Sequence, residues 1–211
     1  MKKENVLATE PISKLLFKFA LPSVIAMIVG AFYNIIDQIY IGNSIGVVGN
    51  SATNVSFPLT TMCIGLSLLI GIGAAARFNL SLGEKKEEEA GKYMGSGFLM
   101  IIIAGLLLTI LVKAFLPSLL TTFGATAENY EYAKTYTDIT SYGFLFLILT
   151  NAGTALIRAD GSPKYSMYAI LVGCITNIIL DPIFIFALDL GMAGAAWATV
   201  CLLYTSDAAD D

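Results

Sequence analysis

The sequence predicts an all-α membrane protein, a bundle of six transmembrane helices. Of its 211 residues, 56% are hydrophobic and 13% are charged, and the mean hydropathy is +0.76. A soluble domain carries roughly 25% charged residues. The apolar residues also gather in long blocks and not in short alternating runs, as expected of helices that cross a bilayer.

Six apolar blocks follow one another, at about 15–41, 50–76, 93–116, 134–157, 165–188 and 192–204. Each of the first five is long enough to cross about 30 Å of hydrocarbon as a helix. We expect the sixth span to be cut short by the end of the chain. Residues 1–14 form a cytoplasmic N-terminal segment before the bundle, which we place at 15–200. The first block is too long for a signal peptide and no small-residue cleavage site closes it, so we interpret it as a retained span.

Polar segments separate the blocks. Residues 42–44 (GNS) are expected to close the first hairpin, and the charged run 83–89 follows the second block. Pro117 is expected to break the third block, and 160–163 (DGSP) is a turn signal. Residues 189–191 leave a very short link, so the last two spans should form an antiparallel hairpin.

The lysines and arginines predict the orientation. If the N-terminus is cytoplasmic, the outside holds only Lys113 and Lys134. The inside then holds the other ten: Lys2, Lys3, Lys14, Lys18, Arg77, Lys85, Lys86, Lys92, Arg158 and Lys164. This bias predicts a multi-pass protein of the bacterial cytoplasmic (inner) membrane with its N-terminus inside.

Several function classes are not expected. The chain has no histidine and no basic stripe, so neither imidazole chemistry nor nucleic-acid binding is predicted. It has no phosphate-binding loop, nucleophile elbow or zinc-protease motif, so we expect neither an enzyme nor a bound cofactor. Cys63, Cys174 and Cys201 lie in apolar surroundings, which favours small reduced hydrophobic side chains.

Two carboxylates fall inside the apolar blocks, Asp37 in the first and Asp181 in the fifth. At 1.5 Å per residue they lie about 27 Å and about 24 Å from the starts of their spans, in the outer half of the membrane. An ionisable group at this depth is costly and points to function, so we expect both to face one cavity. The alternatives are an interfacial position for Asp37 and, for Asp181, a structural hydrogen bond at the kink before Pro182.

Amide and hydroxyl side chains accompany both carboxylates. Residues three or four positions apart share a helix face, which places Tyr33 and Asn34 beside Asp37 and Asn177 beside Asp181, with Asn151 added from the fourth block. Such a set can bind a proton, a sodium ion or a cationic drug. For Tyr33 and Asn151, polar packing between helices is the alternative.

The residues resemble a known family. Segments 177–186 (NIILDPIFIF) and 191–199 (GMAGAAWAT) are similar to spans five and six of the multidrug and toxic compound extrusion (MATE) family, in its bacterial MepA-like and DinF-like branch. Leu21-Pro22, Ala76-Arg77 and 158–161 (RADG) fit the same pattern. The resemblance covers about residues 10 to 200.

The resemblance implies twelve helices in two six-helix lobes, of which this chain would be the N-terminal lobe and the C-terminal lobe its missing partner. It implies export of cationic or amphipathic drugs in exchange for protons or sodium. In that branch, acidic residues of spans one and five carry the coupling ion, and here these positions match Asp37 and Asp181, with Tyr33, Asn151 and Asn177 as neighbours.

Two other functions remain open. A flippase for lipid-linked precursors belongs to the same superfamily, but it would favour lysine or arginine deep in its spans, and none lies there. A non-transporting membrane scaffold would not explain two costly carboxylates with aligned amide partners.

The last eleven residues, 201–211, turn polar and acidic where the sixth span should continue. They resemble translated sequencing-adapter sequence, so we expect this tail to be non-native and the natural protein to continue past Val200. A genuine short cytoplasmic tail is the alternative.

Overall fold

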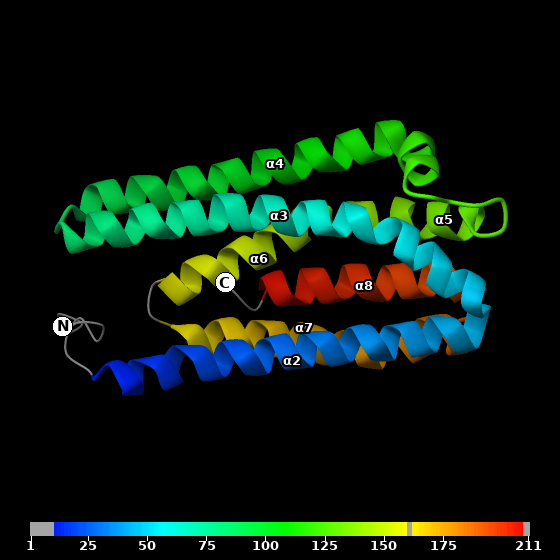
Figure 1. The fold of residues 1–211 in the computed structure, drawn as a ribbon, viewed down its shortest axis with the longest axis horizontal. Helices are drawn as coiled ribbons and strands as arrows, with labels where there is room; N and C mark the ends of the chain where they lie inside the picture. Colours follow the sequence, from blue (N-terminus) through cyan, green and yellow to red (C-terminus); the bar gives the residue numbers. More distant parts are fainter. Residues whose placement is uncertain (1–10, 160–161, 209–211) are drawn as a thin grey trace.

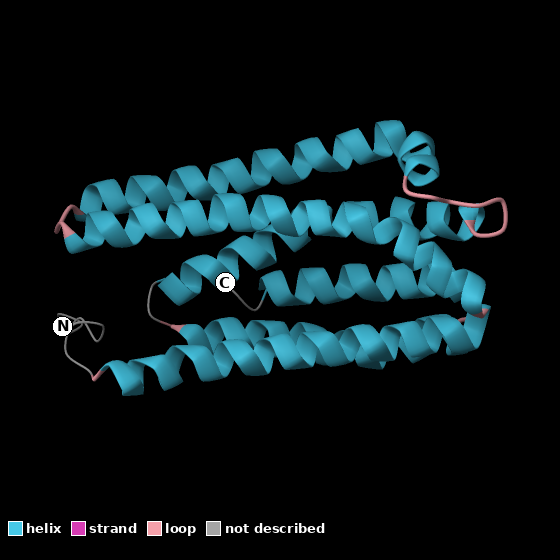
Figure 2. Ribbon diagram, viewed as in Figure 1, coloured by secondary structure: helices cyan, strands magenta, loops and turns pink. Residues whose placement is uncertain are grey.

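A computed structural model describes residues 11–159 and 162–208, which form helices and connections and no strand (Figure 2). The helices are α2 (Ile12–Ile45), α3 (Val47–Gly83), α4 (Glu87–Thr122), α5 (Tyr130–Thr140), the 3-10 turn η1 (Ser141–Gly143), α6 (Phe144–Ala159), α7 (Pro163–Pro182), the π-helix η2 (Ile183–Ala187) and α8 (Gly191–Ala208). Within this described part, five helical stretches are long and apolar enough to span a membrane, and Gly191–Thr205 is a shorter apolar helix. The predicted all-helical membrane bundle is confirmed.

One predicted break is displaced along the chain, and another is confirmed as a kink. Residues 42–44 are still helical, and the first hairpin turns at Gly46, whose φ of 80° suits a residue without a side chain. The break predicted at Pro117 is present as a kink within α4, two residues before the proline. Phe115 has non-helical φ −113° and ψ 15°, and the bend makes room for the proline ring.

The fourth predicted span consists of three consecutive helical segments, α5, η1 and α6. Side chains of α4 contact the irregular turn between α5 and α6. Thr109 Oγ1 donates to the Ser141 carbonyl at 3.3 Å. Lys113 Nζ donates to both the carboxylate and the carbonyl of Asp138, at 2.7 and 2.8 Å, and lies 3.5 Å from the centre of the Tyr142 ring. These contacts supply partners for carbonyls next to the irregular turn.

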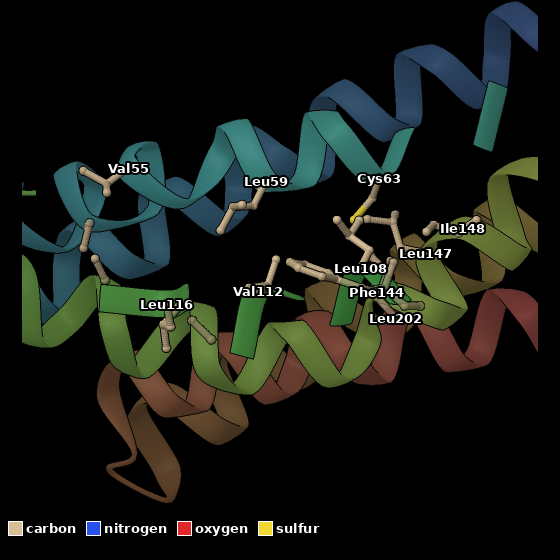
Figure 3. Packing of buried hydrophobic residues seen from close by; sticks show 14 of the residues in the cluster. Val55, Leu59, Cys63, Leu108, Val112, Leu116, Phe144, Leu147, Ile148 and Leu202 are labelled. Carbon is tan, nitrogen blue, oxygen red and sulfur yellow. The ribbon is translucent and has the colours of Figure 1, made fainter. Parts of the chain in front are cut away.

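The bundle has two groups of helices that share a core. α3 packs between α4 and α6, while α2 lies along α7 and α7 pairs with α8 (Figure 1). Apolar side chains from α3, α4, α6 and α8 fill the space between them (Figure 3), among them Val55, Leu59, Leu108, Val112, Leu116, Phe144, Leu147 and Leu202. The three cysteines are free, and Cys63 and Cys174 are buried.

The connections alternate between the two ends of the bundle. The start of α2, the α3–α4 turn and the end of α6 lie at one end (Figure 1). The α2–α3 turn at Gly46, the α4–α5 connection and the α7–α8 link lie at the other. The loops predicted to share the N-terminal side therefore do share one side.

Candidate functional site

The two membrane carboxylates meet where α2 lies along α7. Asp37 is 6% exposed and Asp181 is fully buried. Their carboxyl groups lie close enough to each other to interact. The prediction that the first and fifth spans bring their acidic residues together is therefore correct.

Each carboxylate keeps an oxygen that no described residue satisfies. Asp37 Oδ1 and Asp181 Oδ2 are buried and receive no hydrogen bond from the described part of the chain, and the same holds for Asn177 Oδ1. Asn177 Nδ2 does donate to the other oxygen of Asp181, at 3.3 Å, one turn away on the same helix. A buried polar atom without a partner costs about 1–3 kcal/mol, so three oxygens this close need an explanation.

A polar cavity of about 120 Å³ opens beside Asp37. Its lining residues come from α2, α3, α5, α6 and α8 and are Tyr33, Asn34, Asp37, Gln38, Thr53, Asn54, Phe57, Thr60, Tyr136, Thr140, Phe144, Leu147, Thr199 and Leu203. They combine one carboxylate with amides, hydroxyls and four aromatic rings. No lysine or arginine lines it among the residues that the structure describes.

The predicted residues do not all face this cavity. Tyr33, Asn34 and Asp37 line it, whereas Asp181 and Asn177 do not and are fully buried. The expectation that both carboxylates face one cavity is thus correct for Asp37 and wrong for Asp181. The reason is packing: α7 lies against α2 and α8, and Asp181 is fully buried beside Asp37.

Two of the neighbours bond within their own helices. Asn151 Nδ2 donates to the Leu147 carbonyl at 2.8 Å, and Asn34 Nδ2 donates to the Gly30 carbonyl at 2.9 Å. Asn34 still lines the cavity, but Asn151 does not. The position of Asn151 agrees better with polar packing, which the sequence left open.

Sequence reasoning missed most of the polar lining, including Tyr136 of α5 and Thr199 of α8. Both line the cavity, and Thr199 Oγ1 donates to the Ala195 carbonyl at 2.9 Å. Tyr136 lies near both Thr199 and Asp37. The signal was the spacing of Tyr136 and Thr140, which are four residues apart and share one face of α5.

Hydrogen bonds between helices fix the cavity wall formed by α3. Thr53 Oγ1 donates to Gln38 Oε1 at 3.2 Å, which ties α3 to α2. The hydroxyls of Ser56 and Thr137 lie 2.6 Å apart and tie α3 to α5.

The end of α7 next to Asp181 is irregular. The helix passes from Pro182 into the π-helix Ile183–Ala187, since proline has no N–H to continue the regular pattern. α8 packs tightly against this segment, because a Cβ at Gly194 would lie 2.6 Å from the Phe184 carbonyl oxygen. The Asp-Pro step is a distortion, as predicted, and it stands directly beside the buried carboxylate.

Comparison with known proteins gives a consistent result. The family model described as MatE matches residues 22–183. The multidrug export protein MepA of Staphylococcus aureus (strain NCTC 8325 / PS 47) is 31% identical over 202 residues, which are 94% of this chain and 45% of that protein. MepA of Staphylococcus haemolyticus (strain JCSC1435) is 28% identical over 201 residues, with 94% and 44% covered. The chain thus spans about half the length of the curated relatives it matches.

Solved structures agree with the sequence comparison. A crystal structure of MATE in complex with MaD3S has a TM-score of 0.90 at 27% identity and covers 99% of this chain and 47% of that one. The outward-facing conformation of a multidrug resistance MATE family transporter has a TM-score of 0.88 at 28% identity, with 98% and 46% covered. The bundle therefore has the shape of one half of such a structure.

Proposed function

Because the chain belongs to the MatE family, we propose that it is the N-terminal lobe of a secondary active antiporter that exports cationic or amphipathic drugs. The observation that carries this proposal is the buried pair of Asp37 and Asp181 behind a polar, aromatic-lined cavity. The second lobe would supply the other wall of the transport path.

The carboxylate pair supports coupling to an ion. Two buried carboxylates cannot both stay bare at low cost, so a proton or a cation must accompany them. A proton would be shared between Asp37 and Asp181. A sodium ion would instead take oxygen ligands, and the free oxygens of Asp37, Asp181 and Asn177 are of that type.

The cavity supports a cationic substrate. Tyr33, Phe57, Tyr136 and Phe144 bring aromatic rings to its wall, and aromatic faces attract organic cations. Asp37 supplies the negative charge among them. The absence of lysine and arginine from the described lining favours a cation over the phosphate-bearing substrate of a flippase.

Exchange follows from competition. The drug cation and the coupling ion are both attracted to the charge at Asp37 and Asp181, so binding of one would displace the other. When a proton or sodium ion enters from outside, it neutralises the pair and releases the drug. When the ion leaves to the cytoplasm, the charge returns and a new drug molecule can bind.

Reconstituted transport tests this proposal. We expect the full-length parent protein in proteoliposomes to move a fluorescent organic cation only under an imposed proton or sodium gradient. Collapsing whichever of the two gradients drives transport should reduce the rate to that of empty liposomes. A rate that stays constant when both gradients are collapsed would exclude antiport.

A further inference from the structure

A second hollow, of about 220 Å³, lies between α3 and α4 and is lined by neither carboxylate. At its floor the two helices nearly touch, since a Cβ at Gly97 would lie 2.6 Å from the Cβ of Ala74. We call it the Arg77 groove, with a polar part of Arg77, Tyr93 and Ser96 and an apolar part of Leu69, Ile70 and Met100.

The two walls of the groove match in depth. Arg77 is six residues from the end of α3, and Tyr93 is six from the start of α4, so each lies about 9 Å from the connecting turn. Leu69 and Met100 lie about 20 Å from that turn by the same measure. The groove therefore has its polar part near the membrane surface and its apolar part toward the middle.

Arg77 carries a charge with no counterion among the residues that the structure describes. Within the described residues, no hydrogen bond or ion pair is formed by the side chains of Arg77, Tyr93 or Ser96. The nearby cations differ, because Lys86 pairs with Glu84 at 2.8 Å and Lys92 pairs with Glu88 at 2.8 Å. A guanidinium and two hydroxyls, all on exposed residues, thus line one groove without a partner in the described part of the chain, and this donor set fits a phosphate group.

We propose that the Arg77 groove binds a phospholipid with a negatively charged headgroup from the cytoplasmic leaflet. The phosphate would lie on Arg77, Tyr93 and Ser96, and one acyl chain would lie along Ile70 and Met100. The side chains of Leu69 and Met100 are 72% and 56% exposed, so the apolar part is open to the surroundings. Basic pockets between transmembrane helices on the cytoplasmic side have this chemistry, and the site is independent of the antiport proposed above.

Native mass spectrometry of the purified chain tests the site, with phosphatidylglycerol and phosphatidylethanolamine added in equal amounts. We expect the wild type to retain phosphatidylglycerol, and Arg77→Gln to retain about ten-fold less, as expected for one charged hydrogen-bonding group. The control is Lys92→Gln, which removes an equal charge from the same end but an already paired one and should leave retention unchanged.

A second variant tests whether lipid retention needs the groove itself or only the surface charge of Arg77. Met100→Trp fills the apolar part and keeps Arg77, and it should also lower retention of phosphatidylglycerol. Since Met100 is exposed, this variant should keep the helical circular dichroism spectrum of the wild type.

Three results would overturn the proposal. Equal retention by wild type and Arg77→Gln would mean that Arg77 binds no lipid. Equal retention of the two lipids by the wild type would remove the preference for negative charge. Loss of that preference in the full-length parent protein would mean that its second lobe covers the groove.

Discussion

Helices α2 and α7 each carry one membrane carboxylate but hold it differently. Both place a polar side chain one turn before it, Tyr33 before Asp37 and Asn177 before Asp181. In the most apolar stretch of α2, 12% of the residues are buried, against 33% in the corresponding stretch of the span that contains α7. α2 also runs on as a regular helix past Asp37, whereas α7 becomes a π-helix right after Asp181. Similar sequence patterns therefore give one carboxylate on a loosely packed helix facing a cavity, and one fixed in the protein interior.

The largest expected effect separates the two carboxylates directly. In the full-length parent protein, Asp181→Asn should abolish drug efflux, because the interior member of the pair would no longer bind the coupling ion. Asp37→Asn should weaken efflux to on the order of a tenth, about the loss of one charged hydrogen bond, since Asp181 could still take up the ion. The measurement is drug resistance and vesicle transport at equal membrane expression.

The matched control is Asp189→Asn, the same change in the link that follows the π-helix. Asp189 has φ 52°, a conformation that asparagine tolerates as well as aspartate. Efflux should remain at the wild-type level. If Asp181→Asn also transports normally, Asp181 is only a structural partner of the distorted helix end.

The sequence predicted the spans and the pairing of the acidic residues well, because both depend on local patterns. Apolar blocks of more than twenty residues define helices without reference to the rest of the fold. Asp37 and Asp181 stand out because an ionisable group is rare at such depth.

What the sequence could not predict depends on contacts between distant segments. Whether Asp181 faces the cavity is decided by the rotation of α7 against α2, which no spacing within α7 encodes. Thr199 lies in the segment 191–199, and its approach to Tyr136 requires α5 and α8 to meet. The wrong turn at 42–44 has a simpler cause, since Gly42 is compatible with a helix and it is Gly46, four residues later, that adopts a positive φ.

A smaller effect tests how firmly α7 is held. Gly194→Ala places a methyl group 2.6 Å from the Phe184 carbonyl oxygen, and backbone atoms cannot simply rotate away. We expect a loss of about 1–3 kcal/mol in the free energy of unfolding, the usual cost of overpacking. The apparent melting temperature of the purified chain in detergent measures it. An unchanged melting temperature would mean that α8 does not fix the π-helix.

The smallest expected change in stability comes from a glycine-to-alanine substitution on α2. Gly30 lies mid-helix with no atom within 4 Å of the position a Cβ would take, so Gly30→Ala meets no obstacle. Replacing glycine by alanine within a helix lowers the entropy lost on folding and should raise stability by about 0.5–1 kcal/mol. The bond from Asn34 to the Gly30 carbonyl uses only the backbone and should survive. The melting temperature of the 211-residue chain should therefore rise slightly, opposite in sign to Gly194→Ala. A decrease of similar size to that of Gly194→Ala would show that α2 is packed as tightly as α7, and the difference between the two carboxylates would then need another cause.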